Sequence, residues 1–251
     1  MLQASGLSDY FEQLAQGKVA NRSSIYKFGR VICLGASIRI PMWDGNANYI
    51  FPVTANTVTV TSDDIADAPA GIGARSVHIY GLDENWEEIN EIITLGATST
   101  KTFIRVYRAH VEESGTSDFP YDSTKIGNNK GTITITHNGT TSPIAVILPG
   151  LGQTLMAIFT IPVGYKALMW AAGTNNGKNN DAIGHLYSRD NTIVNAPWRC
   201  RGIRDMYRNL VNKTWRIPRV YTEKTDILFA ISSTNGDTVS GTFELEMVKL
   251  T

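Results

Sequence analysis

Residues Arg75–Leu95, RSVHIYGLDENWEEINEIITL, decide the fold class. In the first half, Val77 and Ile79 alternate with polar or amphipathic neighbours. In the second half, one face carries Ile89, Ile93 and Leu95, with the acidic Glu91 among them. A period of two, with β-branched residues on one face, is typical of half-buried antiparallel strands. The stretch therefore predicts a β-hairpin with a short polar turn.

The rest of the chain repeats this pattern, because alternating or apolar runs are separated by turns rich in Gly, Asn, Asp and Pro. Further strands are expected at 31–35, 38–41, 48–52, 56–62, 101–113, 131–138, 144–148, 153–162, 166–174, 182–188, 214–218, 225–233 and 241–250. One short helix is expected at 7–16, closed by Gly17. Many strands without intervening helices predict antiparallel sandwiches or barrels.

The expected architecture is all-β, with two tandem antiparallel β-sandwich or jelly-roll-like domains after a short N-terminal helix and an extended arm. The expected boundaries are 1–30 for the helix and anchoring arm, 31–142 for the first β-domain and 143–251 for the second. A chain of 251 residues is long enough for one large domain or two small ones.

The formal net charge is zero, with 23 basic and 23 acidic residues, which argues against a free nucleic-acid binder. The charge is uneven: +2 in 1–30 (4 basic, 2 acidic), −6 in 31–142 (7 and 13) and +4 in 143–251 (12 and 8). This asymmetry favours association of copies or a charged partner, although solvated faces of different charge explain it equally well. With no secretory signal or membrane-spanning run, we expect folding in a reducing cytoplasm.

The segment 18–30, KVANRSSIYKFGR, combines four cations with three large apolar residues and shows no long periodicity. A basic, aromatic and non-periodic arm often binds a partner in extended form. The alternative is a strand-like lead-in to the first domain. On the arm interpretation, the residues expected to anchor the chain on a partner are Phe11, Leu14, Tyr26, Lys27, Phe28 and Arg30.

The turn of the opening hairpin is acidic, with Asp83, Glu84, Glu87, Glu88 and Glu91 close together in sequence. Paired carboxylates can hydrolyse glycosides and clustered acids can bind Ca²⁺. However, Glu87 and Glu88 point to opposite faces of a strand and the spacing matches no calcium loop. A solvated hairpin protected by charge is the favoured interpretation.

The other reactive residues match no known site pattern. The four histidines, His78, His110, His137 and His185, lack the spacing of a metal-binding or catalytic motif. His110 beside Glu112 forms a plausible dyad only if a third group joins it. Cys33 and Cys200 match no metal or redox spacing and are expected to be buried free thiols. We therefore expect no enzyme, no metal site and no cofactor.

The segment 199–224 is strongly basic, with eight cations against Asp205 and Glu223, a local net charge of +6. Aromatic residues lie among these cations, a mixture that can grip single-stranded nucleic acid or form a protein interface. The zero overall charge favours the interface, with the acidic hairpin turn of a neighbouring copy as its complement. The residues expected at this contact are Asp83, Glu84, Glu87, Trp198, Arg199, Arg201, Arg204, Arg208 and Trp215.

Most of the chain resembles, in order, a family of virion structural proteins of short-tailed bacteriophages. The segments that carry the resemblance are GKVANRSSIYKFGR (17–30), MWDGNANYIFP (42–52), 66–97, FIRVYRAHV (103–111), GTITI (131–135), 152–169, EKTDILFAIS (223–232) and VSGTFELEMV (239–248). Each segment by itself is largely a strand-and-turn pattern. The resemblance therefore depends on the whole set of segments occurring in the same order. KFGR is followed here by the apolar VICLG instead of an Asn-rich turn. The arginine- and tryptophan-rich stretch 198–219 is individual to this chain, so the resemblance implies no role for it.

The resemblance implies a non-enzymatic component of the virion, assembled in the cytoplasm of a bacterial host. We expect a capsid decoration or cement protein that binds the major capsid protein or another virion protein as a homo-oligomer, a trimer. One alternative is a tail or fibre-base component bound to a tail adaptor. Another is a carbohydrate-binding or glycan-cleaving sandwich that uses Trp43, Trp86 or Trp198 as stacking platforms.

Overall fold

A computed structural model describes residues 5–33, 39–115, 129–176, 181–207, 211–233 and 237–250. One helix, α1 (Ser5–Ala15), precedes a succession of antiparallel strands, which confirms the all-β expectation. Within the described ranges, no helix is long and apolar enough to cross a membrane. Most of the segment between the expected strands 101–113 and 131–138 lies outside the described residues.

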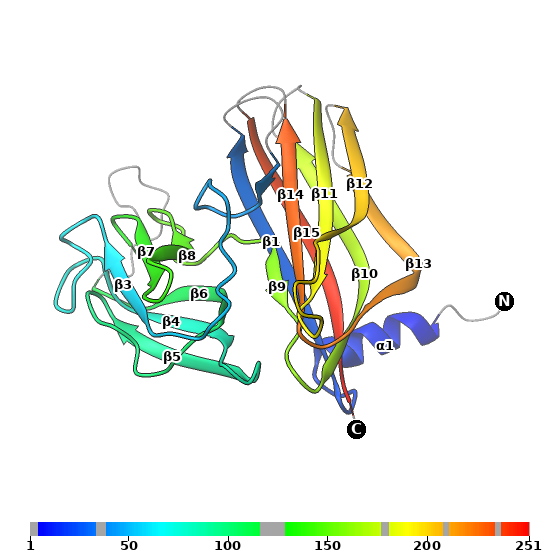
Figure 1. The fold of residues 1–251 in the computed structure, drawn as a ribbon, viewed down its shortest axis with the longest axis horizontal. Helices are drawn as coiled ribbons and strands as arrows, with labels where there is room; N and C mark the ends of the chain where they lie inside the picture. Colours follow the sequence, from blue (N-terminus) through cyan, green and yellow to red (C-terminus); the bar gives the residue numbers. More distant parts are fainter. Residues whose placement is uncertain are drawn as a thin grey trace.

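The larger part of the molecule is a sandwich of two antiparallel sheets (Figure 1). The first sheet contains, in spatial order, β1 (Arg22–Cys33), β15 (Asp237–Lys249), β10 (Tyr165–Asn176) and β13 (Val211–Tyr221). The second contains β12 (Arg199–Tyr207), β11 (Asp181–Asp190), β14 (Thr225–Ser233) and β2 (Ile40–Pro41), and β9 (Ile158–Thr160) also pairs with β14. Aromatic and aliphatic side chains such as Phe159, Phe229 and Phe243 fill the space between the sheets.

The strand order identifies this sandwich as a jelly roll. β2 and β9 pair with the same side of β14, so together they occupy one position. With that position counted second, the eight positions along the chain are ordered 1-8-3-6 in one sheet and 5-4-7-2 in the other. This order corresponds to the two Greek keys of an eight-stranded jelly roll. The expectation of a jelly-roll-like fold is therefore met by the topology itself.

A smaller β-unit is inserted between β2 and β9 (Figure 1). One of its sheets contains β3 (Val58–Ser62), β7 (Ile133–His137) and β8 (Ser142–Ile147). The other contains β5 (Glu88–Thr94), β4 (Ala74–Leu82) and β6 (Arg105–Ser114). β4 and β5 are the predicted hairpin, in register from Ser76 opposite Thr94 to Leu82 opposite Glu88, with Val77 and Ile79 buried.

The strand partners differ from the expected division of the chain at two places. β1, which includes most of the expected arm, pairs along its whole length with β15 near the C-terminus. β8, which falls within the second expected domain, pairs with β7 in the small unit. The jelly roll is therefore built from both ends of the chain, and the inserted unit extends beyond residue 142.

The sequence leaves the arm and the lead-in strand as alternatives because the inward-facing positions of β1 are not regularly apolar. Lys27, Gly29 and Val31 are buried on the same side of β1, and the first two mask the alternation of hydrophobic residues. Gly29 is required by close contact, because an added Cβ would lie 2.3 Å from the amide nitrogen of Ala157 and 2.4 Å from the carbonyl oxygen of Met42. The lead-in strand, and not the free arm, is the conformation observed.

One further segment, 48–52, was expected as a strand and is irregular. Its aromatic residues form a chain of ring contacts between the two units. The ring centroids of Trp43 and Tyr49 are 5.2 Å apart, those of Tyr49 and Phe51 are 4.7 Å apart, and those of Phe51 and Trp198 are 5.0 Å apart. Contacts between successive rings, which are worth about 0.5–1.5 kcal/mol per pair beyond burial, thus replace strand pairing in this connection.

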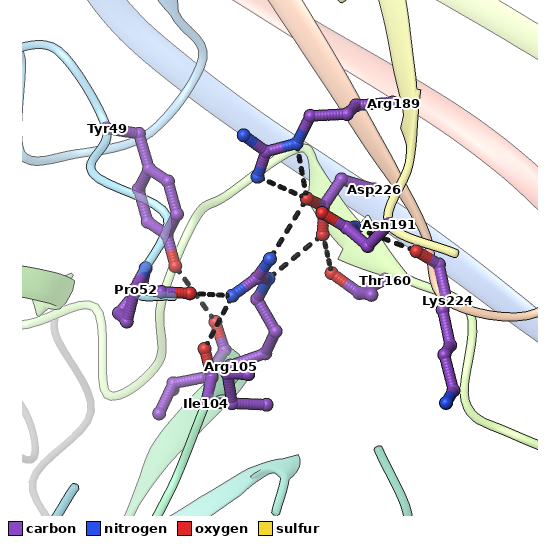
Figure 2. A network of polar contacts seen from close by, with 10 residues as sticks. Tyr49, Pro52, Ile104, Arg105, Thr160, Arg189, Asn191, Lys224 and Asp226 are labelled. Atoms are coloured by element: carbon purple, nitrogen blue, oxygen red, sulfur yellow. Dashed lines mark hydrogen bonds and ion pairs between the residues drawn. The ribbon is translucent and has the colours of Figure 1, made fainter. Parts of the chain in front are cut away.

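A buried ionic network joins the small unit to the jelly roll (Figure 2). Arg105 of β6 donates to both carboxylate oxygens of Asp226 on β14, at 2.9 and 3.0 Å. Arg189 of β11 donates to Asp226 at 2.7 Å, and the Thr160 hydroxyl donates to it at 2.6 Å. Arg105 also donates to the carbonyls of Pro52 and Ile104. Both oxygens of a fully buried carboxylate are therefore satisfied by donors from both units.

The electrostatic state of Asp226 follows from these contacts. Burial alone raises the pKa of a carboxyl group, but the adjacent Arg105 and the Thr160 and Asn191 side chains outweigh it and hold the pKa of Asp226 below its usual value. Asp226 thus remains ionised in the folded protein to lower pH than in the unfolded chain. Its contribution to stability is present above about pH 4 and is lost as the pH falls through the folded-state pKa.

We predict that Arg105→Met lowers the free energy of unfolding by about 3–5 kcal/mol, because it leaves the buried Asp226 carboxylate short of a bidentate partner. Urea unfolding at neutral pH measures the loss. In the same variant, acid destabilisation should begin at higher pH, because the pKa of Asp226 is no longer held as low. The matched control is Arg108→Met, an exposed position on the same strand, which should change stability by less than about 0.5 kcal/mol. Equal stability of the two variants would contradict the role of this network.

Candidate functional site

A groove of about 440 Å³ lies between the jelly roll and the small unit. One wall is the β1 segment 24–28, and the opposite wall is formed by Tyr80, Tyr107 and Arg108 of β4 and β6. Three of the predicted anchoring residues, Tyr26, Lys27 and Phe28, therefore line the same groove. The structure brings them together with aromatic residues of the other unit that the sequence alone did not connect with them.

Lys27 is a buried residue of this groove. Its ammonium group donates a hydrogen bond to the carbonyl oxygen of Tyr107, across the junction of the two units. Burial, with a smaller effect of the nearby Arg108 guanidinium, lowers the pKa of Lys27 to about 7. Because its charged head faces inward, Lys27 is not placed to dock on an external surface as predicted. Instead it links β1 to β6.

We predict that Lys27→Met raises stability at neutral pH and weakens its pH dependence. In the wild type, the unfolded chain binds a proton at Lys27 up to about pH 10.4, whereas the folded chain releases it near pH 7. The free energy of unfolding should therefore rise with pH between about 7 and 10. Urea unfolding at pH 7 and pH 9.5 measures this slope. An unchanged slope in Lys27→Met would show that the buried amine does not cause it, and Lys213→Met is the exposed control.

The predicted N-terminal anchors outside the groove are also held by the chain itself. Leu14 is buried, and the ring of Phe11 meets that of Trp170 edge to face at a centroid distance of 5.7 Å. α1 lies at the lower end of the sandwich (Figure 1), where Tyr10 donates to the Glu246 carboxylate. Arg30 is paired with Asp44 at 2.8 Å. Among the six predicted anchors, only Phe11 and Tyr26 keep largely exposed rings.

The acidic hairpin turn is structured from within. One oxygen of Asp83 accepts hydrogen bonds from the backbone amides of Asn85 and Glu87, both at 2.9 Å. The Trp86 carbonyl accepts from the amide of Val163, which holds the turn against the jelly roll. Glu84 and Glu87 remain exposed. Asp83 therefore shapes the turn, whereas the other two predicted contact residues face solvent.

The basic stretch forms one margin of the jelly roll, since β12 and β13 are the end strands of their sheets (Figure 1). We call this region the β12–β13 margin; its described exposed side chains include Arg199, Arg201, Ile203, Arg216, Ile217 and Val220. Ile217 is 82% exposed. The Arg219 guanidinium lies over the Trp215 ring at 5.0 Å and donates to the carbonyl of Arg201, which joins the two strands.

The outer edges of both strands are suited to pairing. In the described residues, β12 pairs only with β11, and β13 pairs only with β10. Pro218 lies in β13, and proline is tolerated in sheets mainly at such edges. Long edge strands with exposed apolar side chains are surfaces that other chains can extend. Of the predicted contact residues, the Arg204 side chain and Arg208 lie outside the described residues.

The tryptophans expected as stacking platforms do not present free faces. Trp43 is buried in the core between the units. The Arg105 guanidinium lies over Trp86 at 4.9 Å, and the Arg189 guanidinium lies over Trp198 at 4.7 Å. Trp198 also meets Phe51, so it belongs to an intramolecular contact and not to the exposed margin. The glycan-binding alternative therefore loses the residues on which it was based.

A cluster that the sequence did not identify lies beside the groove. The β4–β6 register places His78 directly opposite His110, and Glu112 follows two residues later on β6. A carboxylate oxygen of Glu112 lies 3.1 Å from His110 Nε2 and 3.5 Å from His78 Nδ1. His78 is thus the third group that the His110–Glu112 dyad required. Only the cross-strand register, which the sequence does not contain, reveals it.

Comparison with known proteins assigns no family. No family model and no curated protein matches this chain. A solved structure of infectious bursal disease virus, Gt strain, aligns with 91% of this chain and 73% of its own, at 10% sequence identity and a TM-score of 0.22. A likeness at that score does not establish a shared fold, so it decides nothing about the function of this protein.

Proposed function

We propose that this protein is a non-enzymatic structural component of a tailed-phage virion, a decoration protein that binds the major capsid protein and stabilises the head. The observation that carries the proposal is the jelly-roll order of the larger sandwich. Jelly rolls recur in viral capsids, although also in lectins and cupins, so the fold alone does not assign the function. The ordered sequence resemblance to virion proteins favours the virion role over the other functions that jelly rolls have.

The β12–β13 margin supports self-association, which a decoration protein needs at symmetric positions. Its arginines are exposed next to Ile217 and Val220, and arginine with apolar residues is a composition enriched at protein interfaces. The proposed occupant is a second copy of this chain. Glu84 and Glu87 on the exposed hairpin turn supply the complementary charge. Repetition of this heterologous contact around a three-fold axis closes a trimer.

On this proposal the capsid-facing end is the one that carries α1. Phe11 and Tyr26 have exposed rings, whereas the other predicted anchors make contacts within the chain. Full burial of each such ring against a partner contributes roughly 1.5–3 kcal/mol to the free energy of binding. Deletion of residues 1–30 is not a clean test of this end, because it also removes most of β1 from its sheet.

We predict that this protein is present in purified particles of the phage that encodes it, in a number matched to the head lattice. Quantitative mass spectrometry against the major capsid protein measures the copies per particle. Hundreds of copies support head decoration, whereas tens of copies favour the alternative of a tail or fibre-base component. Absence from the particles would overturn both.

We predict that Ile217→Lys weakens self-association of the purified protein by about 30-fold, the effect of losing roughly 2 kcal/mol at an interface hot spot. Analytical ultracentrifugation measures the dissociation constant. Ile65→Lys is the matched control, because Ile65 is 97% exposed on a loop of the small unit. It should leave association unchanged.

A charge-reversal pair tests the identity of the contact. Arg199→Glu with Arg216→Glu should weaken association, and adding Glu84→Arg with Glu87→Arg in the same chain should restore it. Restoration requires that the margin of one copy meets the hairpin turn of another. If the variant with all four substitutions associates no better than the variant with two, the hairpin turn is not the partner of this margin.

A further inference from the structure

We propose that His78, His110 and Glu112 form a binding site for a first-row divalent metal ion, with Zn²⁺ as the representative ion. One donor atom from each side chain lies within 4.8 Å of the donors of the other two. The site lies on the outer face of the sheet formed by β5, β4 and β6, beside the groove between the units. It is separate from the β12–β13 margin and does not depend on the proposed virion role.

The donor set suits such an ion. Imidazole nitrogens with one carboxylate oxygen are ligands that Zn²⁺ and other first-row divalent metals accept. Ligand atoms about 2.0–2.1 Å from a tetrahedral zinc are about 3.3 Å from one another. The two measured separations from the Glu112 oxygen, 3.1 Å to His110 Nε2 and 3.5 Å to His78 Nδ1, lie on either side of that value. Two of the three separations are therefore close to those of a tetrahedral site, and the third, between the histidine donors, is within 4.8 Å.

The sheet holds the site without a change of fold. His78 and His110 are cross-strand partners in the β4–β6 ladder, so their Cβ atoms are fixed on the same face. Glu112 follows His110 by two residues, at a register shift of the ladder, and the 3.1 Å contact between its carboxylate and His110 Nε2 places it beside that face. A His-x-Glu pair on one strand and a histidine opposite it thus supply three ligands from two rigid neighbours. Neither histidine is fully exposed, and Glu112 faces solvent, which leaves an entry path.

Hydrogen bonds around the site orient His78 for coordination. His78 Nε2 lies 3.1 Å from the Asn90 side-chain oxygen, which accepts only if that nitrogen carries the proton. Protonation at Nε2 leaves the lone pair on Nδ1, the nitrogen that faces Glu112. Metal-binding histidines commonly donate their second ring N–H to an oxygen in this way. Asn90 on β5 therefore holds the His78 ring with Nδ1 towards Glu112.

The other neighbours complete the surroundings. The Tyr80 hydroxyl lies 3.1 Å from His78 Nδ1, and its ring stacks on His78 with centroids 4.3 Å apart. A metal at Nδ1 replaces that hydrogen bond. The far nitrogen of His110, Nδ1, is buried and has no hydrogen-bond partner among the described residues. In the metal-free protein the Glu112 carboxylate accepts a hydrogen bond from His110 Nε2, so a metal ion bound at Nε2 displaces that proton.

The test is metal binding to tag-free full-length protein. Zn²⁺ titration by calorimetry, and Co²⁺ titration followed by its visible absorption, should each give one equivalent per chain. His110→Ala and Glu112→Gln should each weaken binding by at least about 10-fold. Zn²⁺ should also raise the melting temperature of the wild type, because a ligand that binds only the folded state stabilises it. The rise should be smaller in both variants at the same Zn²⁺ concentration.

The matched control is Glu113→Gln. Glu113 is the next residue on β6, exposed and paired with Arg75 at 3.1 Å, so it tests whether any carboxylate on this strand contributes. It should bind Zn²⁺ as the wild type does. The proposal is overturned if the wild type takes up no metal, or if His110→Ala and Glu112→Gln bind as tightly as Glu113→Gln. Melting curves without metal verify that all three variants are folded.

Discussion

The carboxylate of Asp226 is the group on which the arrangement of the two units depends. It lies on β14 of the jelly roll, buried at the junction of the two units, and its bidentate partner, Arg105, comes from the small unit. Breaking a buried ion pair is strongly destabilising, so Arg105 holds the small unit against a carboxylate that Arg189 of the jelly roll also pairs with. The aromatic chain from Trp43 to Trp198 runs beside this ion pair and excludes water from it. The ion pair fixes the position of the small unit relative to the jelly roll, and the packed aromatic rings shield the ion pair from water.

The sequence was sufficient for the fold class and for the opening hairpin, because alternation of apolar residues is a local property that β4 and β5 preserve. It was insufficient for β1, where Lys27 and Gly29 occupy inward positions for reasons outside the strand: a carbonyl of Tyr107 and the close backbone of Met42 and Ala157. The two ends of the chain also meet in one sheet. No local pattern reports that pairing, so a division into consecutive domains was the natural but incomplete interpretation.

The candidate sites show the same limit. The basic and aromatic composition of 199–224 indicated an interface, and the structure places β12 and β13 at an open margin, but it moves Trp198 into the interior. The acidic turn suggested a site because its residues are adjacent in sequence, yet Asp83 is used to shape the turn. His78 and His110 are far apart in sequence and become neighbours only through the β4–β6 register. Residues that are neighbours in the sequence need not form a site, and residues that are neighbours across two strands cannot be found from the sequence alone.

The inserted unit enters and leaves the jelly roll at a single point. Trp43 and Met156 form an antiparallel bridge there, and the Ala157 amide donates to the Met42 carbonyl at 2.9 Å. For the backbone, residues 44–155 are therefore a closed excursion whose ends are already neighbours, and changes of length within it need not shift any strand of the jelly roll. The inserted unit does, however, supply one of the two cations that pair with Asp226. Without it, Arg189 is the remaining cation of that carboxylate. Loops of this unit can therefore change in length without moving the jelly roll, whereas loss of the unit also removes Arg105 from Asp226.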